Sequence, residues 1–239
     1  MRKDHRPYYI KKAYLNIQKA YVKRFLRPQF ESLGNGFTFM KPWHVEIFGS
    51  PIDIGNYATV IATSDNKIRF SIWPKKKDEG RIRIGDYCLI CPGVRISSAS
   101  KITIGDSCMI ASSAYITDCD WHDIYNRISI GKSSPVKIEN NVWIGDSAIV
   151  CKGVTIGENS VVGAGAVVVD SVAPNVIVAG TPARVVKSLD PDKNIVTRAR
   201  WFSEPIRLFE EIDQWDRELL KENTLLRWIR SMVTPIKGD

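Results

Sequence analysis

An aliphatic side chain recurs at every sixth residue in the second half of this 239-residue chain. The series runs without a gap through Ile138, Ile144, Val150, Ile156, Val162 and Val168. A second track lies four positions behind the first, and its residues are all small or β-branched: Val142, Ala148, Val154, Ser160, Ala166 and Val172. This period is too short for helices. It is typical of short strands joined by tight corners, which stack into a parallel β-solenoid.

The same period extends toward the N-terminus. It fits Ile84, Ile90 and Ile96 and, after a slip of two residues near Ile102, also Ile104, Ile110 and Ile116. Three hexads make one triangular coil. We therefore expect Ile138, Ile156 and Pro174 to stack on one edge, each about 4.8 Å from the next.

Charge is distributed unevenly along the chain. Residues 1–28 contain nine basic side chains and one acidic side chain, which equals the net charge of +8 for the whole protein. The rest is balanced, which disfavours a nucleic-acid-binding domain. There is no apolar run long enough for a membrane span and no secretory signal, so we expect a cytoplasmic protein, with its five cysteines reduced.

Two segments resemble a known family. The run from Ile144-Gly145 to Val168 and the segment from Val178 to Val186, which contains Gly180-Thr181-Pro182-Ala183, are similar to the hexapeptide-repeat acyltransferases, in particular the galactoside/maltose O-acetyltransferase branch. The resemblance implies an all-β core folded as a left-handed parallel β-helix, an exception to the usual right-handed crossover. It also implies a homotrimer with active sites between subunits, and acetyl-CoA or another acyl-CoA as co-substrate.

The repeat is interrupted between Ile116 and Ile138, where 22 residues replace six. We expect a loop over residues 117–135, within a β-helix domain of residues 44–187 flanked by helical segments 1–43 and 188–239. His122 lies in this loop, and Val142-Trp143-Ile144-Gly145 follows it, as the family pattern implies for a catalytic histidine.

Moving an acyl group to a hydroxyl needs a base that accepts a proton near neutral pH. His122 is the candidate for this role. Asp118, Asp120 and Asp123 are all close enough in sequence to orient its second ring nitrogen. The sequence does not choose among these carboxylates, and a loop histidine that faces solvent is the alternative.

The resemblance also implies a binding site for the acyl-CoA. Trp143 would lie beside the acceptor or cofactor. Close-packed corners at Gly145, Gly163 and Ala164 would hold the pantetheine arm, and the basic residues Arg184 and Lys187 would lie near the nucleotide phosphates. Trimer packing, solenoid corners and a solvated C-terminal cap are the structural alternatives. We expect no metal, because a trimeric carbonic anhydrase needs three histidines at each site and the repeat region has only His44 and His122.

The chain departs from the family in two places. The stretch Ser97-Ser98-Ala99-Ser100 stands where relatives often have an asparagine, and Trp121-His122-Asp123 replaces the His-Pro of the sugar acetyltransferases. We therefore expect O-acyl transfer to a sugar or glycan hydroxyl, with the acceptor open. An N-acetyltransferase acting on an amino sugar and a non-catalytic trimeric scaffold are the alternatives.

Both ends of the chain are expected to be helical. Apolar and aromatic residues at helical spacing between Ile10 and Phe25 share the first 28 residues with basic side chains and predict an amphipathic helix ended by Pro28. This helix is expected either to lie on anionic lipid as a peripheral membrane contact or to pack on the solenoid. After Pro191 we expect helix to about Met232 as a cap.

Overall fold

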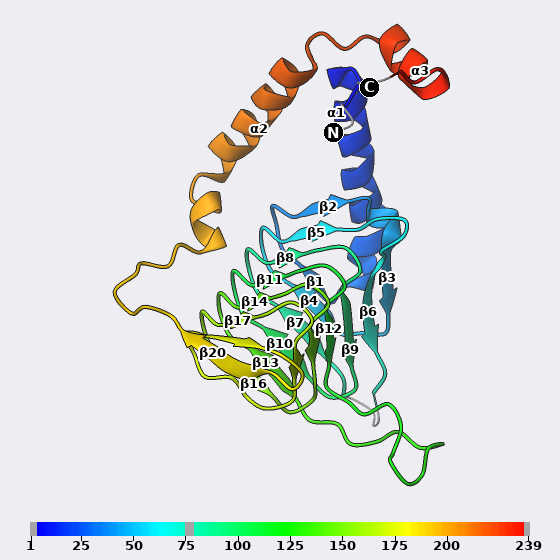
Figure 1. Cartoon of the computed structure of the whole chain (residues 1–239). Helices are drawn as coiled ribbons and strands as arrows, with labels where there is room; N and C mark the ends of the chain where they lie inside the picture. Colours follow the sequence, from blue (N-terminus) through cyan, green and yellow to red (C-terminus); the bar gives the residue numbers. More distant parts are fainter. Residues whose placement is uncertain (1–3, 75–78, 237–239) are drawn as a thin grey trace. The chain divides into compact units, whose positions relative to one another are not determined.

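Short parallel strands stacked in coils form most of the chain (Figure 1). The computed structural model describes residues 4–74 and 79–236. Each coil contributes strands to three sheets, here called A, B and C. Sheet A has the order β1 (Ser32–Leu33), β4 (Ile52–Ile54), β7 (Ile82–Ile84), β10 (Ile102–Ile104), β13 (Val136–Ile138), β16 (Thr155–Ile156).

The other two sheets follow the same progression along the solenoid. Sheet B has the order β2 (Thr38–Met40), β5 (Thr59–Ile61), β8 (Leu89–Ile90), β11 (Met109–Ile110), β14 (Trp143–Ile144), β17 (Val161–Val162), β19 (Val176–Ala179), β20 (Arg184–Ser188). Sheet C has the order β18 (Val167–Val168), β15 (Ile149–Val150), β12 (Tyr115–Thr117), β9 (Arg95–Ser98), β6 (Ile68–Ile72), β3 (Val45–Phe48). Among the strands in the described ranges, only β20 runs antiparallel to its neighbour.

The six-residue track forms the core. Its aliphatic side chains point inward and are almost completely buried. Ile138 pairs in register with Ile156, which confirms the expected 18-residue coil at this point. The expectation for Pro174 was wrong, because Ile156 bridges to Val172 instead. The last coil is two residues shorter, since the chain between β18 and Val172 turns without a full hexad.

Corners between sheets A and B are fixed by a ladder of side chains. The amides of Asn35, Asn56, Asp86 and Asp106 each donate to a side-chain oxygen in the next coil, at 2.6–2.9 Å. The following residue adopts a positive φ, as at Tyr57, Tyr87 and Ser107. Asparagine and aspartate are frequent at such corners because their side chains replace backbone hydrogen bonds.

The solenoid begins before residue 44. β1 pairs with β4 and β2 with β5, so residues 32–40 already form the first coil rather than a helical N-terminal segment. Val22 and Leu26 belong to the buried core. The C-terminal segment also differs from a continuous helix: residues 189–197 are irregular, and the turn at Arg198–Phe202 precedes α2 (Pro205–Leu220) and α3 (Leu225–Val233). Pro205 starts α2, and Thr224 caps α3 by accepting from the Arg227 amide.

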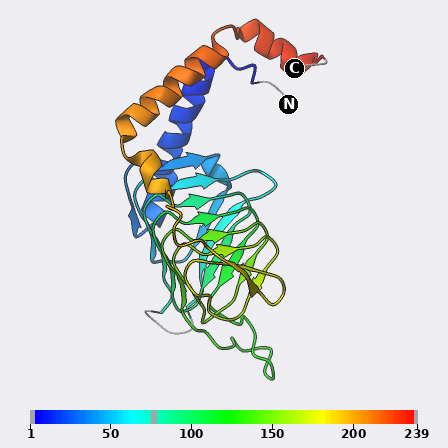
Figure 2. The same cartoon turned by 60° about the vertical axis from the view of Figure 1, so that its left-hand side comes forward.

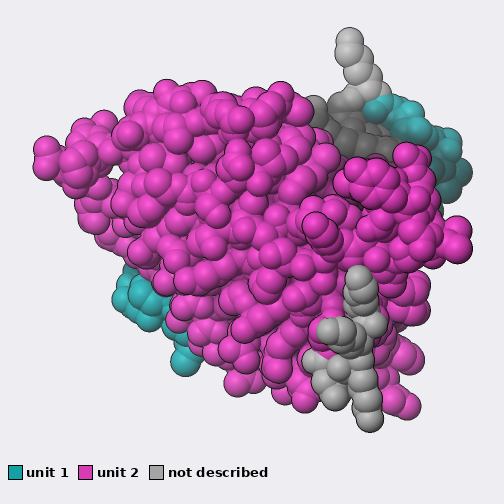
Figure 3. Space-filling model, turned by 90° about the horizontal axis from the view of Figure 1, so that it is seen from below, with its two compact units in different colours: residues 1–20, 201–239 teal, residues 21–200 magenta. Residues whose placement is uncertain are grey.

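The chain divides into two compact units (Figure 3): residues 1–20 with 201–239, and residues 21–200. The first, called the helical unit here, joins the start of α1 (Tyr8–Tyr21) to α2 and α3. Arg2 and Lys3 of the predicted basic segment lie outside the described residues. No helix in the described ranges has the length and apolar character needed to cross a bilayer.

Charged contacts hold α1 against α2. Lys12 and the Tyr8 hydroxyl both bind the carboxylate of Asp213, and Lys11 Nζ lies 2.6 Å from Asp216 Oδ1. The Arg217 guanidinium lies over the Tyr8 ring, 4.5 Å from its centroid. Two of the basic side chains of α1 are thus neutralised by aspartates of α2, a partner that was not among the expectations for this helix.

Replacing Asp213 with asparagine should loosen α1 from α2. Hydrogen bonds from Lys12, Arg217 and Tyr8 hold the pKa of Asp213 far below its ordinary value of 3.8. A depressed folded-state pKa stabilises the fold above the ordinary value, and this stabilisation disappears as the pH falls below it. The protection of residues 8–20 against hydrogen exchange, measured relative to the intrinsic rate at the same pH, should therefore fall in Asp213→Asn at pH 7, and in the wild type below about pH 3.8.

The matched control is Glu210→Gln, which removes the same charge from an exposed site on the same helix. Its exchange rates in α1 should equal those of the wild type. Equal protection of α1 in wild type and Asp213→Asn at pH 7 would contradict the prediction.

Candidate functional site

The interruption of the repeat forms a loop of residues 118–135 between β12 and β13, which projects from the solenoid (Figure 2). The loop is anchored by Asp118, whose carboxylate is completely buried. Its oxygens accept hydrogen bonds from Ser98 Oγ at 2.7 Å and from the amides of Ala99 at 2.7 Å and Ser100 at 2.9 Å. Asp118 therefore holds the base of the loop on the preceding coil.

The two sides of the loop pair with each other. Cys119 bridges Ser133 in antiparallel sense, and the Asp120 amide donates to the Lys132 carbonyl at 2.9 Å. Gly131 permits this close approach, because a Cβ there would lie 2.7 Å from the carbonyl oxygens of Asp120 and His122. The loop is thus a hairpin that presents His122 on an ordered backbone.

His122 is exposed, and one of its ring nitrogens is held. Nδ1 lies 2.8 Å from the carbonyl oxygen of Arg127. A carbonyl only accepts hydrogen bonds, so Nδ1 carries the proton in the neutral ring. The lone pair is then on Nε2, which is the form required of a general base.

The candidate aspartates have other partners. Asp120 forms an ion pair with Lys152 Nζ at 2.7 Å, and Asp123 Oδ1 accepts from the amides of Tyr125 and Asn126 at 2.9 Å each. Asp118 is also occupied, because it is buried at the base of the loop. The group that orients His122 is therefore the Arg127 carbonyl and not a carboxylate. Sequence reasoning missed this because a backbone carbonyl leaves no signal in the sequence.

An aromatic contact links the loop back to sheet C. Trp121 Nε1 donates to the Tyr115 hydroxyl at 2.9 Å, and the Arg95 guanidinium lies 4.4 Å from the centre of the Tyr115 ring. This chain of contacts braces the residue directly before His122. The sequence did not predict this contact, which joins side chains on two adjacent coils to one in the loop.

The predicted cofactor residues gather elsewhere, on sheet B and its following corner. Trp143 is 47% exposed and pairs in register with Met109 and Val161. Gly145 stacks on the next coil, where a Cβ would lie 2.6 Å from the Ala164 amide nitrogen. The close-packed corners at Gly145, Gly163 and Ala164 therefore continue the face that Trp143 begins.

Arg184 and Lys187 extend the same face on β20. Lys187 pairs with Ile177 of β19, and Ile177 in turn pairs with Val161 of β17. Arg184 pairs with Ala179, which packs against Gly163. Both basic side chains are exposed. Arg184 Nη1 lies 3.2 Å from Asp170 Oδ2 at the surface, where such a pair contributes little.

His122 and Trp143 lie on different faces of one solenoid. The loop leaves from β12 in sheet C, whereas Trp143 belongs to β14 in sheet B. The structure thus brings the cofactor candidates together but separates them from the candidate base.

The cysteines are free thiols. Cys88 and Cys108 occupy adjacent coils, and a hydrogen bond with Cys108, together with burial, raises the pKa of the Cys88 thiol. Burial also raises the pKa of Cys91 and Cys151. These thiols are protonated at neutral pH and unsuited to act as nucleophiles.

A stacked aromatic pair lies at the same edge of sheet C as the loop. The rings of Phe48 and Trp73 are 4.1 Å apart with an interplanar angle of 22°, and both are about half exposed. The Trp73 amide donates to the Ser98 carbonyl at 2.8 Å, so Trp73 lies one coil from the residues that anchor Asp118. Sequence reasoning missed this pair, because its members are far apart in the chain.

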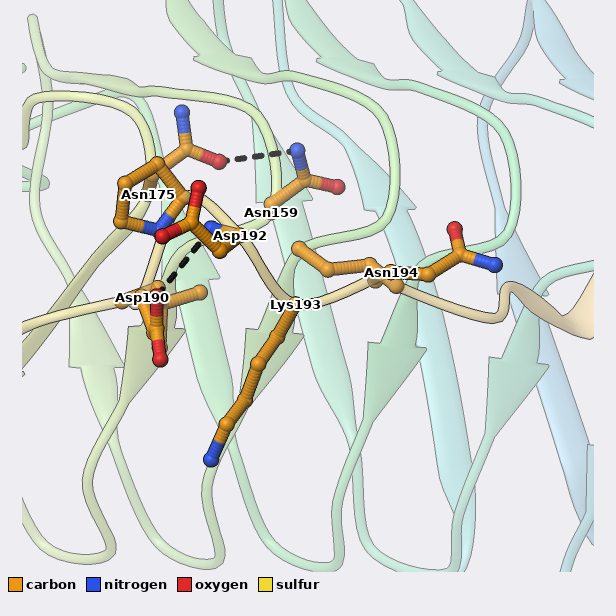
Figure 4. A pocket seen from close by; sticks show the side chains of 9 residues that line it. Asn159, Asn175, Asp190, Asp192, Lys193 and Asn194 are labelled. Atoms are coloured by element: carbon orange, nitrogen blue, oxygen red, sulfur yellow. Dashed lines mark hydrogen bonds between the residues drawn. The ribbon is translucent and has the colours of Figure 1, made fainter.

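A groove of about 600 Å³ lies elsewhere on the solenoid (Figure 4). It is lined by Asn159, Asn175 and residues 189–195, and the two asparagine amides are joined by a hydrogen bond of 3.0 Å. The groove contains no histidine and none of the residues predicted for the site.

Comparison with known proteins agrees with the repeat pattern. Residues 135–170 match the model of the bacterial transferase hexapeptide (six repeats). This segment of the chain is therefore similar to the hexapeptide-repeat transferases. The chain is 40% identical over 118 residues to the galactoside O-acetyltransferase of Escherichia coli K12, a match that covers 49% of each protein.

Another curated protein and a solved structure are also similar to parts of this chain. A 2,3,4,5-tetrahydropyridine-2,6-dicarboxylate N-acetyltransferase of Clostridium perfringens is 53% identical over 57 residues, which is 24% of each chain. The chain thus spans about half the length, or less, of these curated relatives. A mutant of AntD, an N-acyltransferase from Bacillus cereus solved with dTDP-4-amino-4,6-dideoxyglucose and coenzyme A, aligns with a TM-score of 0.58 and 21% identity over 83% of this chain and 96% of AntD. The predicted left-handed β-helix with flanking helices is confirmed.

Proposed function

We propose that the protein transfers an acyl group from a CoA thioester to a hydroxyl of a sugar or glycan. The contact between His122 Nδ1 and the Arg127 carbonyl carries this proposal, because it leaves Nε2 as the proton acceptor. The match to a galactoside O-acetyltransferase over half of the chain supports the reaction class.

The reaction follows from this arrangement. Nε2 of His122 takes the proton of the acceptor hydroxyl as its oxygen attacks the thioester carbonyl. When the tetrahedral intermediate collapses, the carbon–sulfur bond breaks and the CoA sulfur leaves with the electron pair. The imidazolium returns its proton to that sulfur, so no covalent enzyme intermediate is needed.

The sheet B face is the proposed site for the acyl-CoA. Trp143 and the close-packed corners at Gly145, Gly163 and Ala164 offer a surface with few protruding side chains, which suits an extended pantetheine arm. The exposed cations of Arg184 and Lys187 suit its phosphates. On binding, the Arg184 guanidinium would exchange its ion pair with Asp170 for one with a phosphate oxygen.

The separation of His122 from the sheet B face favours a homotrimer. In a trimer with sites between subunits, the loop of one subunit meets sheet B of the next. The loop tip supports this arrangement, because Tyr125 is 96% and Ile128 98% exposed in the single chain. Apolar side chains of this size are usually covered by a partner.

The acceptor is proposed to lie near the Phe48–Trp73 pair. Aromatic faces pack against the apolar faces of sugar rings, and the hydroxyls of Ser71 and Ser97, 2.9 Å apart on the same sheet, offer hydrogen bonds. An amino sugar is the second candidate acceptor. The N-acetyltransferase relative that is 53% identical over 57 residues supports transfer to nitrogen, although its own substrate is a tetrahydropyridine dicarboxylate and not a sugar. The same base would serve an amine.

The test is turnover of acetyl-CoA with matched acceptors. The full chain is incubated with galactosides, glucosides and their 2-amino counterparts, and free CoA thiol and product mass are measured. We expect thiol release that depends on a hydroxyl acceptor and gives a product heavier by one acetyl group. Modification of amino acceptors alone would replace O-transfer by N-transfer. Absence of both CoA binding and thiol release would indicate a non-catalytic scaffold.

A further inference from the structure

A cationic side chain lies on the outer face of sheet C, beside the patch proposed for the acceptor. Arg95 and Ser97 both point outward from β9, because side chains alternate along a strand and the intervening Ile96 is buried. The two residues are about 7 Å apart along the strand. The Ser97 hydroxyl lies 2.9 Å from Ser71 Oγ, and Ser71 pairs in register with Phe48 of the aromatic pair. Arg95 is therefore the next outward residue of β9 from the serine pair.

The positive charge of Arg95 has no carboxylate of its own. Glu46 is the only acidic residue in the six strands of sheet C. Its two oxygens are taken by Lys67 Nζ and Arg69 Nε, each at 2.7 Å. In the part of the chain that the structure describes, no carboxylate forms an ion pair with Arg95. The outer face of sheet C thus carries a surplus of positive charge.

The carboxylates at the base of the loop are also committed. Asp118 is buried and accepts hydrogen bonds from Ser98 Oγ and two backbone amides. Asp120 is paired with Lys152. Neither carboxylate can serve Arg95 without giving up these contacts. A ligand that brings its own anionic group would supply the partner that the fold does not.

The Arg95 side chain is held in place by an aromatic ring. Its guanidinium lies 4.4 Å from the centre of the Tyr115 ring, and Tyr115 is its register partner on the adjacent coil. Contact with an aromatic ring orders a guanidinium and leaves its N–H groups able to bind a carboxylate or phosphate in two-pronged fashion. The Tyr115 hydroxyl accepts from Trp121 Nε1, directly before His122. The same tyrosine therefore joins the cation to the loop that carries the candidate base.

We propose that Arg95 is a specificity-determining residue that selects acceptor sugars carrying an anionic group, either a carboxylate or a phosphate. Two N–H groups of the guanidinium donate to oxygens of that group, and the sugar ring packs against the Phe48–Trp73 pair. The assignment of this face to the acceptor rests on the proposed acyl transfer. A carboxylate on the sugar and a phosphate on the sugar are recognised by the same chemistry, so the experiment includes one of each.

The test compares three acceptors with the full chain and acetyl-CoA: methyl galactoside, galacturonic acid and galactose 1-phosphate. The carboxylate and the phosphate lie at opposite ends of the sugar, so one anionic acceptor keeps the 6-hydroxyl. We expect the kcat/KM of the wild type to be about 10- to 100-fold higher for at least one anionic acceptor than for methyl galactoside. A preference for galacturonic acid identifies a carboxylate, and a preference for galactose 1-phosphate identifies a phosphate.

Arg95→Gln should abolish this preference and leave the kcat/KM for methyl galactoside within about twofold of the wild type. Arg95→Lys should keep part of the preference, because lysine retains the charge but not the planar fork. The matched control is Arg83→Gln, which removes the same charge from an exposed position of β7 in sheet A of the same coil. This control should keep the full preference. Circular dichroism should be unchanged in all three variants, since both arginines are exposed.

Isothermal titration calorimetry of the same sugars without acetyl-CoA gives a readout that does not depend on turnover. Equal affinity of the wild type for neutral and anionic sugars would overturn the proposal. So would an equal loss of affinity for the anionic sugar in Arg95→Gln and Arg83→Gln. If methyl galactoside alone released thiol, acyl transfer would stand and the anionic acceptor would be wrong. If no acceptor released thiol, acyl transfer would fail, and the calorimetry would still decide whether Arg95 binds the anion.

Discussion

Replacing His122 with alanine is expected to lower kcat by about 10²- to 10⁴-fold, which is the usual contribution of a general base. The loop should stay folded, since His122 is exposed and the buried anchor of the loop is Asp118. The KM for acetyl-CoA should therefore remain close to that of the wild type. Steady-state kinetics with thiol detection measures both parameters.

His44→Ala is the matched control, because His44 is a second histidine of the solenoid and lies in a turn between β2 and β3. It should leave kcat within a few-fold of the wild type. Asp120→Asn should also retain most activity, because the Arg127 carbonyl, not Asp120, holds Nδ1. Normal turnover in His122→Ala would remove His122 from the mechanism.

Replacing Asp118 with alanine should have the largest effect on the fold. The change leaves Ser98 Oγ and the amides of Ala99 and Ser100 without their buried acceptor. Each buried unsatisfied group costs about 1–3 kcal/mol, and Ser98 keeps a second contact at the Arg81 carbonyl. We expect the free energy of unfolding to fall by about 3–5 kcal/mol and kcat to fall with it, because the base of the loop loses its anchor.

Urea unfolding and kinetics on the same preparation measure the two effects. Asp120→Asn is the comparison two residues along the same loop. Its half-exposed ion pair with Lys152 should contribute no more than about 1 kcal/mol. If Asp118→Ala unfolded at the same urea concentration as Asp120→Asn, the anchoring role of Asp118 would be wrong.

The repeat region could be predicted well because its signal is local. An inward aliphatic residue every six positions fixes strand length, corner position and the stacking of Ile138 on Ile156. The prediction failed at Pro174, where the last coil is shortened. It also placed the start of the solenoid too late, since β1 and β2 have too few residues to show a period.

The sequence indicated which residues belong to the candidate site, but not which contacts hold them in place. The interrupted repeat located the loop and His122. The family resemblance indicated Trp143, Gly145 and Gly163, and the structure shows that they lie on one face. The role of Asp118 as a buried anchor came only from the structure, because three donors on the preceding coil converge on it. The sequence had left it equal to Asp120 and Asp123.

At the ends of the chain, too, the sequence determined some features and the tertiary structure determined others. The sequence by itself determined that residues 1–28 carry the whole net charge and that the flanking segments are amphipathic. Only the tertiary structure decided that Asp213 and Asp216 engage the lysines of α1 and that α3 keeps its apolar side exposed. Periodicity is a property of neighbours along the chain, whereas ion pairs and exposed faces depend on which distant segments meet. The solenoid could therefore be predicted from its repeat, but the partners of its flanking helices could not.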